Sequence, residues 1–426
     1  MFAKSFDGNR NKAYATWQYF GSPVKSADRN QLPLETTWVR KYDRTLNVPN
    51  SDEKWTDVNN GTLAQGQAYE ISQPKPATYR FIGELNTADF TFPVDGMASA
   101  TNYQDMNILA NPYTGAMSID KLDFSGATAA DKVVYLFNTG SRKDWIANSG
   151  PTTNGTTQGQ YTKAIPANLA GHVAGMPNQI PSLSSFMVKS TAAGNLKYRY
   201  ADLVTATEEN RAPQRHFHSL AVDVESAKTA DRLWLVQAEG TTDRYDNGWD
   251  GEKIFAPGEA ALYAMQDRSY QVTTTDAIGE TKVGFVPGDG EQNYKLTFHL
   301  DGGDGTQQYT LLDKRTGLTR AIHDGDTYEF TATKGDAAHR FTILGNGAKA
   351  TADQRGFQIS ADLRRNFTVK NFTDQPAEAL VFDAAGKIQA RFTVEPGSEN
   401  TGTVVMPGAY VVRVSNKVPT LTQRFV

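Results

Sequence analysis

Cysteine is absent from the 426 residues, which excludes disulfide bonds, a thiolate nucleophile, cysteine-ligated zinc and iron–sulfur clusters. The chain also lacks an excess of either charge, since 43 Lys and Arg face 47 Asp and Glu for a formal net charge of −4. A nucleic-acid-binding protein would carry a basic surplus, so we expect no nucleic-acid partner. The sequence contains no run of roughly 18 apolar residues, which excludes a membrane-spanning helix.

The amino terminus also lacks the apolar core of a secretory signal, because residues 1–8 read MFAKSFDG. Two interpretations follow from this: a cytoplasmic protein, or a fragment without its signal and upstream domains. What the chain does have is 39% hydrophobic and 11% aromatic residues. That content is enough to build packed cores, so we do not expect extensive disorder.

Apolar residues recur at every second position, which is the period of a strand. Leu296, Phe298 and Leu300 would share one face of a strand, and so would Tyr410 and Val412. Gly, Asp, Asn and Pro clusters interrupt these runs at short intervals, as turns between short strands do. The pattern predicts an all-β fold of tandem antiparallel β-sandwich domains, jelly-roll or Ig-like, ending in a small Ig-like sandwich.

A weak internal repeat occupies the first 190 residues. The repeated segments pair as 17–24 with 106–113, 37–42 with 133–137, and 63–71 with 180–188. Two copies are too few for a solenoid, so we interpret them as two halves of one β-sandwich. Small, polar, turn-forming stretches near residues 195 and 350 then predict three domains: 1–194, 195–347 and 348–426.

The last block resembles the C-terminal sorting domain of the type IX secretion system of the Bacteroidetes. The segment 379–388 resembles that family's hairpin of apolar strand, Asp, Gly and basic residue, and 406–414 resembles its Pro-Gly-hydrophobe-Tyr strand. The family's usual opening Asn-Pro is replaced by Ala361-Asp362. The positions that match the motif residues are Asp383, Gly386, Pro407, Gly408, Tyr410 and Val412.

The upstream chain resembles regions of very large surface proteins of the same bacteria, as in the segment 243–253 after the strand 233–236. The resemblance implies a secreted protein on the bacterial cell surface, of which this chain would be a C-terminal piece. It also implies as partners the type IX outer-membrane machinery, its sortase and a lipopolysaccharide anchor. Glycans and host or cell-surface proteins are further partners that the upstream sandwiches would suit.

The acidic stretch after residue 242 is the best candidate for a bound ion. Its members are Asp243, Asp246, Asn247, Asp250 and Glu252. Ca²⁺ takes six to eight oxygen ligands, which clustered carboxylates can supply, although the spacing does not follow an EF-hand loop. The alternative is a solvated turn whose side chains cap backbone amides. We therefore expect no cofactor other than this candidate Ca²⁺.

Catalytic signatures are missing from the sequence. It contains no Gly-x-Ser-x-Gly elbow and no phosphate-binding loop before a helix. His216 and His218 would share a strand face, but no nearby acidic residue completes a metal site. We expect the chain not to be an enzyme.

The favoured hypothesis is a non-catalytic C-terminal region of a surface protein, in which the last domain is the type IX export and sorting signal. The upstream sandwiches would then be structural or adhesive modules. The alternative is a carbohydrate-binding, lectin-like module of a polymer-degrading surface protein. For that role Trp249 has the best chance of exposure among the tryptophans, whereas Trp234 belongs in a core.

Overall fold

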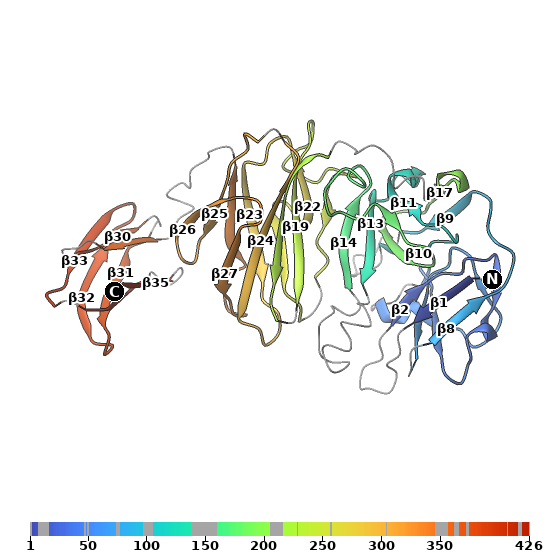
Figure 1. The fold of residues 1–426 in the computed structure, drawn as a ribbon, viewed down its shortest axis with the longest axis horizontal. Coiled ribbons are helices and arrows are strands. Elements are labelled where there is room, and N and C mark those ends of the chain that lie inside the picture. The colour runs from blue at the N-terminus through green and yellow to red at the C-terminus, as the bar shows by residue number, and fades with distance from the viewer. Residues whose placement is uncertain are drawn as a thin grey trace. The chain divides into compact units, whose positions relative to one another are not determined.

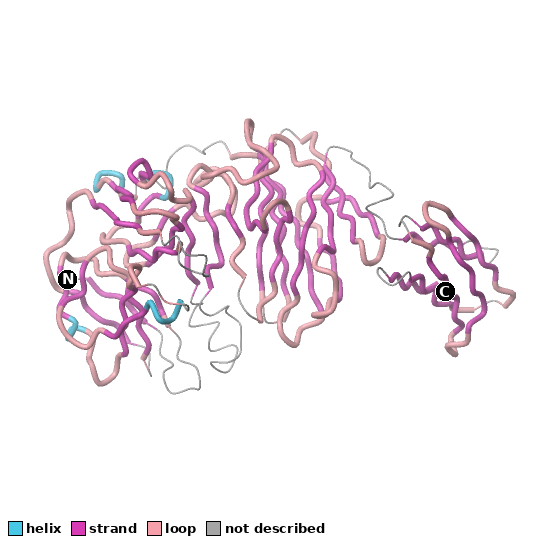
Figure 2. Tube along the Cα trace, turned by 180° about the vertical axis from the view of Figure 1, so that it is seen from behind, coloured by secondary structure: helices cyan, strands magenta, loops and turns pink. Residues whose placement is uncertain are grey.

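The structure, a computed structural model, confirms the all-β fold, and the labelled elements of its ribbon are strands (Figure 1). It describes residues 2–6, 17–46, 48, 51–73, 77–96, 105–138, 160–204, 216–227, 229–255, 258–303, 305–345, 357–361, 366–371, 375–406, 408–415 and 420–425. The helical segments in these ranges, cyan in Figure 2, are single 3-10 turns. They are η1 (Arg29–Gln31), η2 (Ser51–Lys54), η3 (Ile119–Lys121) and η4 (Tyr200–Asp202).

The chain forms two compact units that are each discontinuous in sequence. The first comprises Met1–Asp276, Pro287–Gly302 and Thr327–Lys334, and the second comprises Ala277–Val286, Gly303–Asp326 and Gly335–Val426. The division into domains at residues 194 and 347 stays a prediction.

The predicted internal repeat corresponds to two four-stranded sheets of the same strand order. The first is β2 (Gln18–Phe20), β7 (Tyr69–Ser72), β4 (Trp38–Tyr42) and β5 (Trp55–Asp57). The second is β10 (Met106–Ala110), β16 (Ser185–Lys189), β13 (Val133–Asn138) and β14 (Gln160–Pro166). Even the register agrees, because Phe20 faces Tyr69 where the equivalent Leu109 faces Phe186.

Smaller ladders also recur in the repeat. A two-stranded ladder of β3 (Ser26–Asp28) and β6 (Thr62–Ala64) has its counterpart in β11 (Met117–Ser118) and β15 (Gln179–Ile180), and each first strand runs into a 3-10 turn. Two further ladders complete this region: β1 (Phe2–Phe6) with β8 (Ala77–Phe81), and β12 (Asp123–Gly126), β17 (Gly194–Tyr198) and β9 (Phe90–Val94).

The two repeat halves meet at equivalent positions. The backbone N–H of Gly21 donates to the carbonyl of Leu183 at 3.0 Å, and that of Ala110 donates to the carbonyl of Gly66 at 3.1 Å. Gly21 and Ala110 occupy the same place in the repeat, and so do Gly66 and Leu183. Leu183 is the one non-glycine residue with positive φ in the described part of the chain, and Gly66 shares that conformation. The two copies of the repeat are therefore in direct contact through equivalent residues.

A larger sheet follows in the first unit. Its order is β21 (Ala261–Met265), β22 (Ser269–Thr275), β19 (Ala230–Gln237), β18 (His218–Glu225), β24 (Asn293–Asp301) and β27 (Thr327–Thr331), and β20 (Gly251–Glu252) pairs with β22. The pair β19–β22 is parallel, whereas β18–β19, β18–β24 and β24–β27 are antiparallel. Trp234 is 1% exposed and packs in a core with Ala221 and Val236, as predicted for that tryptophan.

The second unit contains the antiparallel strands β26 (Leu318–Ile322), β25 (Tyr309–Asp313), β28 (His339–Gly345) and β23 (Glu280–Val286), in that order. The buried ion pair between Arg340 and Asp313 joins β28 and β25, with Nη2 2.8 Å from Oδ2. Because both charges are buried, loss of either one would leave the other unpaired and destabilise this pair of strands.

The C-terminal residues form two antiparallel sheets around a shared apolar core. One sheet contains β29 (Phe357–Ala361), β30 (Asn366–Asn371) and β33 (Glu399–Thr403). The other contains β32 (Ile388–Val394), β31 (Ala377–Asp383), β34 (Tyr410–Ser415) and β35 (Thr420–Phe425). The core includes Val369, Val381, Val394 and Val412, so both sheets contribute to it. Among the described residues, no helix has the length and apolar character needed to cross a membrane.

Candidate functional site

The predicted ion-binding stretch lies in the loop between β19 and β20, and its last member, Glu252, is in β20. Within it, the backbone N–H groups of Trp249 and Asp250 both donate to the carbonyl of Asp246, each at 3.0 Å. Gly248 has φ +89°, a conformation that favours glycine. The turn places Trp249 partly buried against the core, with its ring edge-on to Phe217 at 5.7 Å between centroids. Trp249 is therefore less exposed than a sugar-stacking ring would need to be.

The acidic side chains of this turn bind backbone and hydroxyl donors. Asp250 is fully buried; its Oδ1 accepts from the N–H and the hydroxyl of Thr274, and its Oδ2 accepts from the N–H of Asp246 at 2.7 Å. The Asp246 carboxylate accepts from the N–H of Thr242 at 2.6 Å. Burial raises the pKa of Asp250 to about 6 despite these donors.

The other three acidic or amide side chains, Asp243, Asn247 and Glu252, bind residues from other parts of the chain. Asn247 accepts from the N–H of Lys132 at 2.7 Å, and Asp243 accepts from the hydroxyl of Thr275 at 3.1 Å. Glu252 lies 2.6 Å from both Lys189 and Arg268. The ammonium of Lys189 opposes the effect of burial on Glu252 and, with Arg268, keeps the pKa of this carboxyl below its ordinary value.

These contacts correspond to the alternative that the sequence left open, a turn whose side chains cap backbone amides. Within the described ranges, no group of three or more His, Asp or Glu residues is arranged to hold a metal ion. The Ca²⁺ hypothesis stays a prediction, and a direct test of it is given below.

Three of the predicted sorting-motif residues, Asp383, Gly386 and Tyr410, lie at one end of the C-terminal sandwich. Asp383 closes the β31–β32 hairpin, since its Oδ1 accepts from the N–H groups of Ala385 at 2.9 Å and Lys387 at 3.0 Å. Gly386 has φ +79°, a conformation that favours glycine, in the turn 384–387 between the two strands. These bonds to backbone N–H groups lower the pKa of the Asp383 carboxyl. The motif's Asp and Gly therefore fix the shape of a turn.

The second part of the motif lies on β34, next to that hairpin. Asp383 and Tyr410 face each other in the ladder of β31 and β34. Tyr410 is 5% exposed and its hydroxyl donates to the carbonyl of Met406, and Val412 is fully buried. This confirms the predicted orientation of β34. Gly408 lies two residues before the strand, and Pro407 lies outside the described residues.

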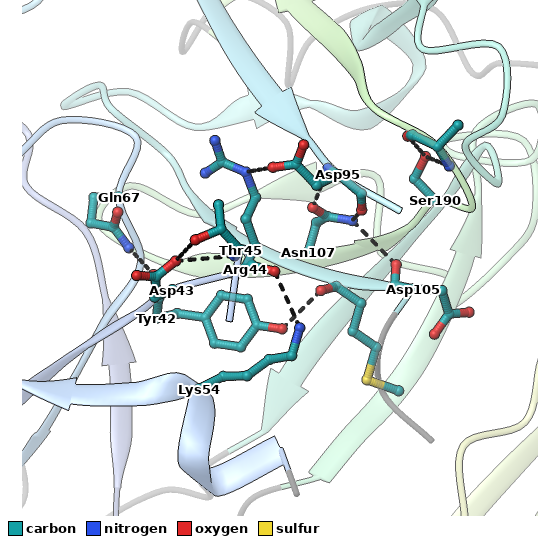
Figure 3. Close-up of polar contacts among 12 residues, drawn as sticks. Tyr42, Asp43, Arg44, Thr45, Lys54, Gln67, Asp95, Asp105, Asn107 and Ser190 are labelled. Atoms are coloured by element: carbon teal, nitrogen blue, oxygen red, sulfur yellow. Dashed lines mark hydrogen bonds and ion pairs between the residues drawn. The ribbon is translucent and has the colours of Figure 1, made fainter. Parts of the chain in front are cut away.

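A buried polar network that the sequence did not reveal surrounds Lys54 (Figure 3). Lys54 is 1% exposed, and its Nζ donates to the carbonyl of Arg44 at 3.2 Å. Burial lowers the pKa of this ammonium, whereas the negative charges of Asp43, Asp105 and Asp95 raise it. In the sequence Lys54 belongs to the charged run Ser51–Lys54, which resembles an ordinary solvated turn. No sequence signal distinguishes it from one.

The network joins the two repeat halves. Arg44 Nε donates to Asp95 at 2.8 Å, and Asn107 binds Asp95 both ways: its Oδ1 accepts from the N–H at 2.8 Å and its Nδ2 donates to the carbonyl at 2.9 Å. The Tyr42 hydroxyl donates to the carbonyl of Met106 on β10 at 2.8 Å. A lysine that acts as a nucleophile needs a neighbouring base, and in the described part of the chain no carboxylate is hydrogen-bonded to Lys54 Nζ. The arrangement is suited to holding the two halves together.

The sequence also placed two histidines on one strand without an acidic partner, and the fold supplies one. Asp301 at the end of β24 lies beside them, with its carboxylate 2.8 Å from His216 Nδ1 and its carbonyl oxygen 3.1 Å from His218 Nδ1. Asp301 is far from both histidines in sequence, which is why their spacing alone could not reveal it.

The amino-acid sequence of this chain matches a known sequence family. Residues 7–344 match the family described as "Domain of unknown function (DUF8693)", and the chain belongs to this family. The chain is also 30% identical over 425 residues to the protein named "Minor fimbrium subunit Mfa5" of Porphyromonas gingivalis. That alignment covers 94% of this chain and 34% of the relative, so the chain spans about a third of the relative's length.

Two solved structures have weak similarity to the chain. A Faecalibacterium prausnitzii β-glucuronidase is 13% identical at a TM-score of 0.16, covering 50% of this chain and 47% of that one. A biofilm-associated protein BSP domain is 9% identical at a TM-score of 0.14, covering 99% and 95% of the two chains. Scores this low establish no shared fold.

Proposed function

We propose that this chain is a non-catalytic part of a secreted bacterial cell-surface protein. In this proposal, the two repeat halves within residues 17–190 and the larger sheet of the first unit are structural or adhesive modules. The observation that carries the proposal is the similarity to the minor fimbrium subunit along 94% of the chain. A fimbrium subunit is a surface component, and a relative aligned this extensively supports the same setting here.

The last domain, in this proposal, is the signal for type IX export and sorting. Its support is the sequence resemblance together with the place of the motif residues, because Asp383, Gly386 and Tyr410 meet at one end of the sandwich. The partners would be the outer-membrane machinery and its sortase, with attachment to lipopolysaccharide after sorting.

The catalytic alternative has less support. The buried acidic groups described above bind backbone, hydroxyl or basic groups of the chain itself, as Asp250, Glu252 and Asp313 do. Structural ion pairs of this kind perturb pKa values without implying a reaction.

The test is export from a host that has the type IX machinery. The chain, supplied with a signal peptide and an epitope tag, should reach the cell surface, where protease added to whole cells removes the tag. A version lacking residues 357–425 should stay in the periplasm. Equal surface exposure of both versions would contradict the sorting role, and cytoplasmic retention by a native-length gene product would contradict the surface assignment.

A further inference from the structure

The outward face of three neighbouring strands in the first unit carries a regular set of polar side chains. Along β24, Tyr294, Leu296 and Phe298 point into the core, so the alternate residues face outward. The ladders place Glu225 of β18 opposite Lys295, and Lys295 opposite Glu329 of β27. Since neighbouring strands lie about 4.8 Å apart, these three side chains form one row roughly 10 Å long.

A second row lies two residues further along the strands. Asn293 faces Thr331 in the ladder of β24 and β27, which are adjacent in Figure 1. Both residues are exposed, and so is Glu329. A shallow cavity of about 510 Å³ lies over the two rows, and its lining includes Glu225, Lys295, Glu329, Asn293 and Thr331. This volume lies within the range of small-ligand sites, about 300–1,000 Å³.

Two polar side chains of this cavity, Glu329 and Asn293, are available to a ligand. Within the described part of the chain, the side chains of Glu329 and Asn293 make no hydrogen bond or ion pair. The Glu225–Lys295 pair is 3.4 Å long, with its side chains 49% and 42% exposed. An exposed pair of this kind stabilises the fold by at most about 1 kcal/mol, so a ligand can replace it at low cost.

We propose that this face of β18, β24 and β27 is a binding site for a neutral or amino-sugar oligosaccharide. Each sugar hydroxyl both donates and accepts a hydrogen bond, and the site offers both kinds of group: Glu329 accepts, Lys295 donates, and the Asn293 amide does both. The inference goes beyond the proposed export role and does not depend on it.

A basic peptide is the competing ligand, because two carboxylates face one ammonium here. It is disfavoured for two reasons. The β24 backbone is paired on both sides, so a peptide over this face finds no free main-chain groups to bind. The ammonium of Lys295 lies between the two acids and would repel a lysine-rich chain.

The affinity should be low. Polar groups that are open to water contribute little net free energy each, and the row of side chains offers no exposed aromatic ring for stacking. We expect a dissociation constant near the millimolar range for one site, which surface display of many copies would raise to useful avidity.

The experiment is binding of the full chain to an immobilised array of neutral and amino-sugar oligosaccharides. The strongest oligosaccharide is then titrated in solution by saturation-transfer NMR, with tetralysine as a second probe. The variants are Glu329→Gln and Asn293→Ala, and the control is Glu239→Gln, an exposed acid of the same unit outside the cavity. Thermal melting of each variant verifies folding.

Binding by the wild type and the control, with at least a tenfold loss in both cavity variants, would support the site. The inference would be overturned if the wild type bound no oligosaccharide at millimolar concentration, or if the cavity variants bound as well as the control. It would also be overturned if tetralysine alone bound and 0.5 M salt abolished that binding, since salt screens exposed charge interactions.

Discussion

The contact between the two repeat halves can be tested by moving one methyl group from Ala110 to Gly21. Gly21 and Ala110 are equivalent in the two halves and face each other there. A Cβ added at Gly21 would lie closer than 3.0 Å to the Ala110 Cβ, which real Cβ atoms essentially never do. The same Cβ would lie 3.5 Å from the Ala110 Cα, an ordinary contact. Gly21→Ala alone should therefore clash, and Ala110→Gly should remove the severe part of the clash, leaving a tight 3.3 Å contact with the Asn111 carbonyl oxygen.

The magnitudes follow from packing. Overpacking a close contact costs about 1–3 kcal/mol, which is the expected loss for Gly21→Ala. Ala110→Gly removes one buried methyl, about 0.8 kcal/mol, and adds backbone entropy to the unfolded chain, about 0.5–1 kcal/mol. In the double variant the new methyl fills the space that the old one left. Its free energy of unfolding should exceed the additive expectation by about 1–3 kcal/mol.

The assay is urea unfolding of the full chain followed by tryptophan fluorescence. All six tryptophans lie at or before residue 249, within the first unit, so this signal reports that unit alone. Gly115→Ala is the matched control, because its Cβ would meet Leu203 at an ordinary 3.6 Å. A double variant that loses the sum of the two single losses would refute the contact between the repeat halves.

Three further predictions concern buried or clustered charge in the first unit. Arg29→Met should destabilise the first unit by several kcal/mol, because the buried guanidinium donates to the carbonyls of Val58, Leu32 and Thr37. Each carbonyl left unpaired costs about 1–3 kcal/mol. Unfolding followed by tryptophan fluorescence measures this loss, and Arg29→Lys should lose less stability than Arg29→Met. If the turn 243–252 binds Ca²⁺, millimolar Ca²⁺ should raise the melting temperature, and identical melting curves with Ca²⁺ and with chelator would leave only the capped turn. Burial, with Glu291 and Asp289 nearby, raises the pKa of Glu259 to about 7. Because the folded state keeps this proton to a higher pH than the unfolded state does, the free energy of unfolding should fall as pH rises from about 4.5 to 7. Melting curves at pH 5 and pH 8 should show this fall in the wild type and a smaller one in Glu259→Gln.

The features that the sequence predicted depend on local pattern. Alternation along β24 and β34 and the Asp and Gly of the β31–β32 turn are fixed within a few residues, so period and turn chemistry sufficed for them. The repeat was visible because each copy keeps its own strand and turn residues, and their similarity led to two sheets of one order.

The features that it missed depend on partners distant in sequence. Arg29 is satisfied by carbonyls up to 29 residues away, and Asp301 reaches His216 across 85 residues. The acidic turn shows the same limit. Neighbouring carboxylates suggest a cation when only the sequence is considered, but the donors that bind this turn, such as Thr274 to Asp250 and Lys132 to Asn247, come from distant parts of the chain.

The last prediction concerns β34 of the C-terminal sandwich and separates its fold from its proposed sorting role. Val412 is fully buried, opposite Val381 in the ladder, whereas the neighbouring Arg413 is exposed. Val412→Asp should unfold the domain, because an unpaired charge in an apolar core costs several kcal/mol, comparable to the whole stability of a small domain. Arg413→Ala should change stability by no more than about 0.5 kcal/mol.

In a type IX host, the tagged full chain with Val412→Asp should lose protease-accessible surface tag, and Arg413→Ala should keep it. Normal display of the Val412→Asp chain would mean that export does not depend on the folded sandwich. Loss of display by a stably folded Arg413→Ala chain would instead place the arginine in the surface that the export machinery contacts, because burial cannot explain a defect at an exposed side chain.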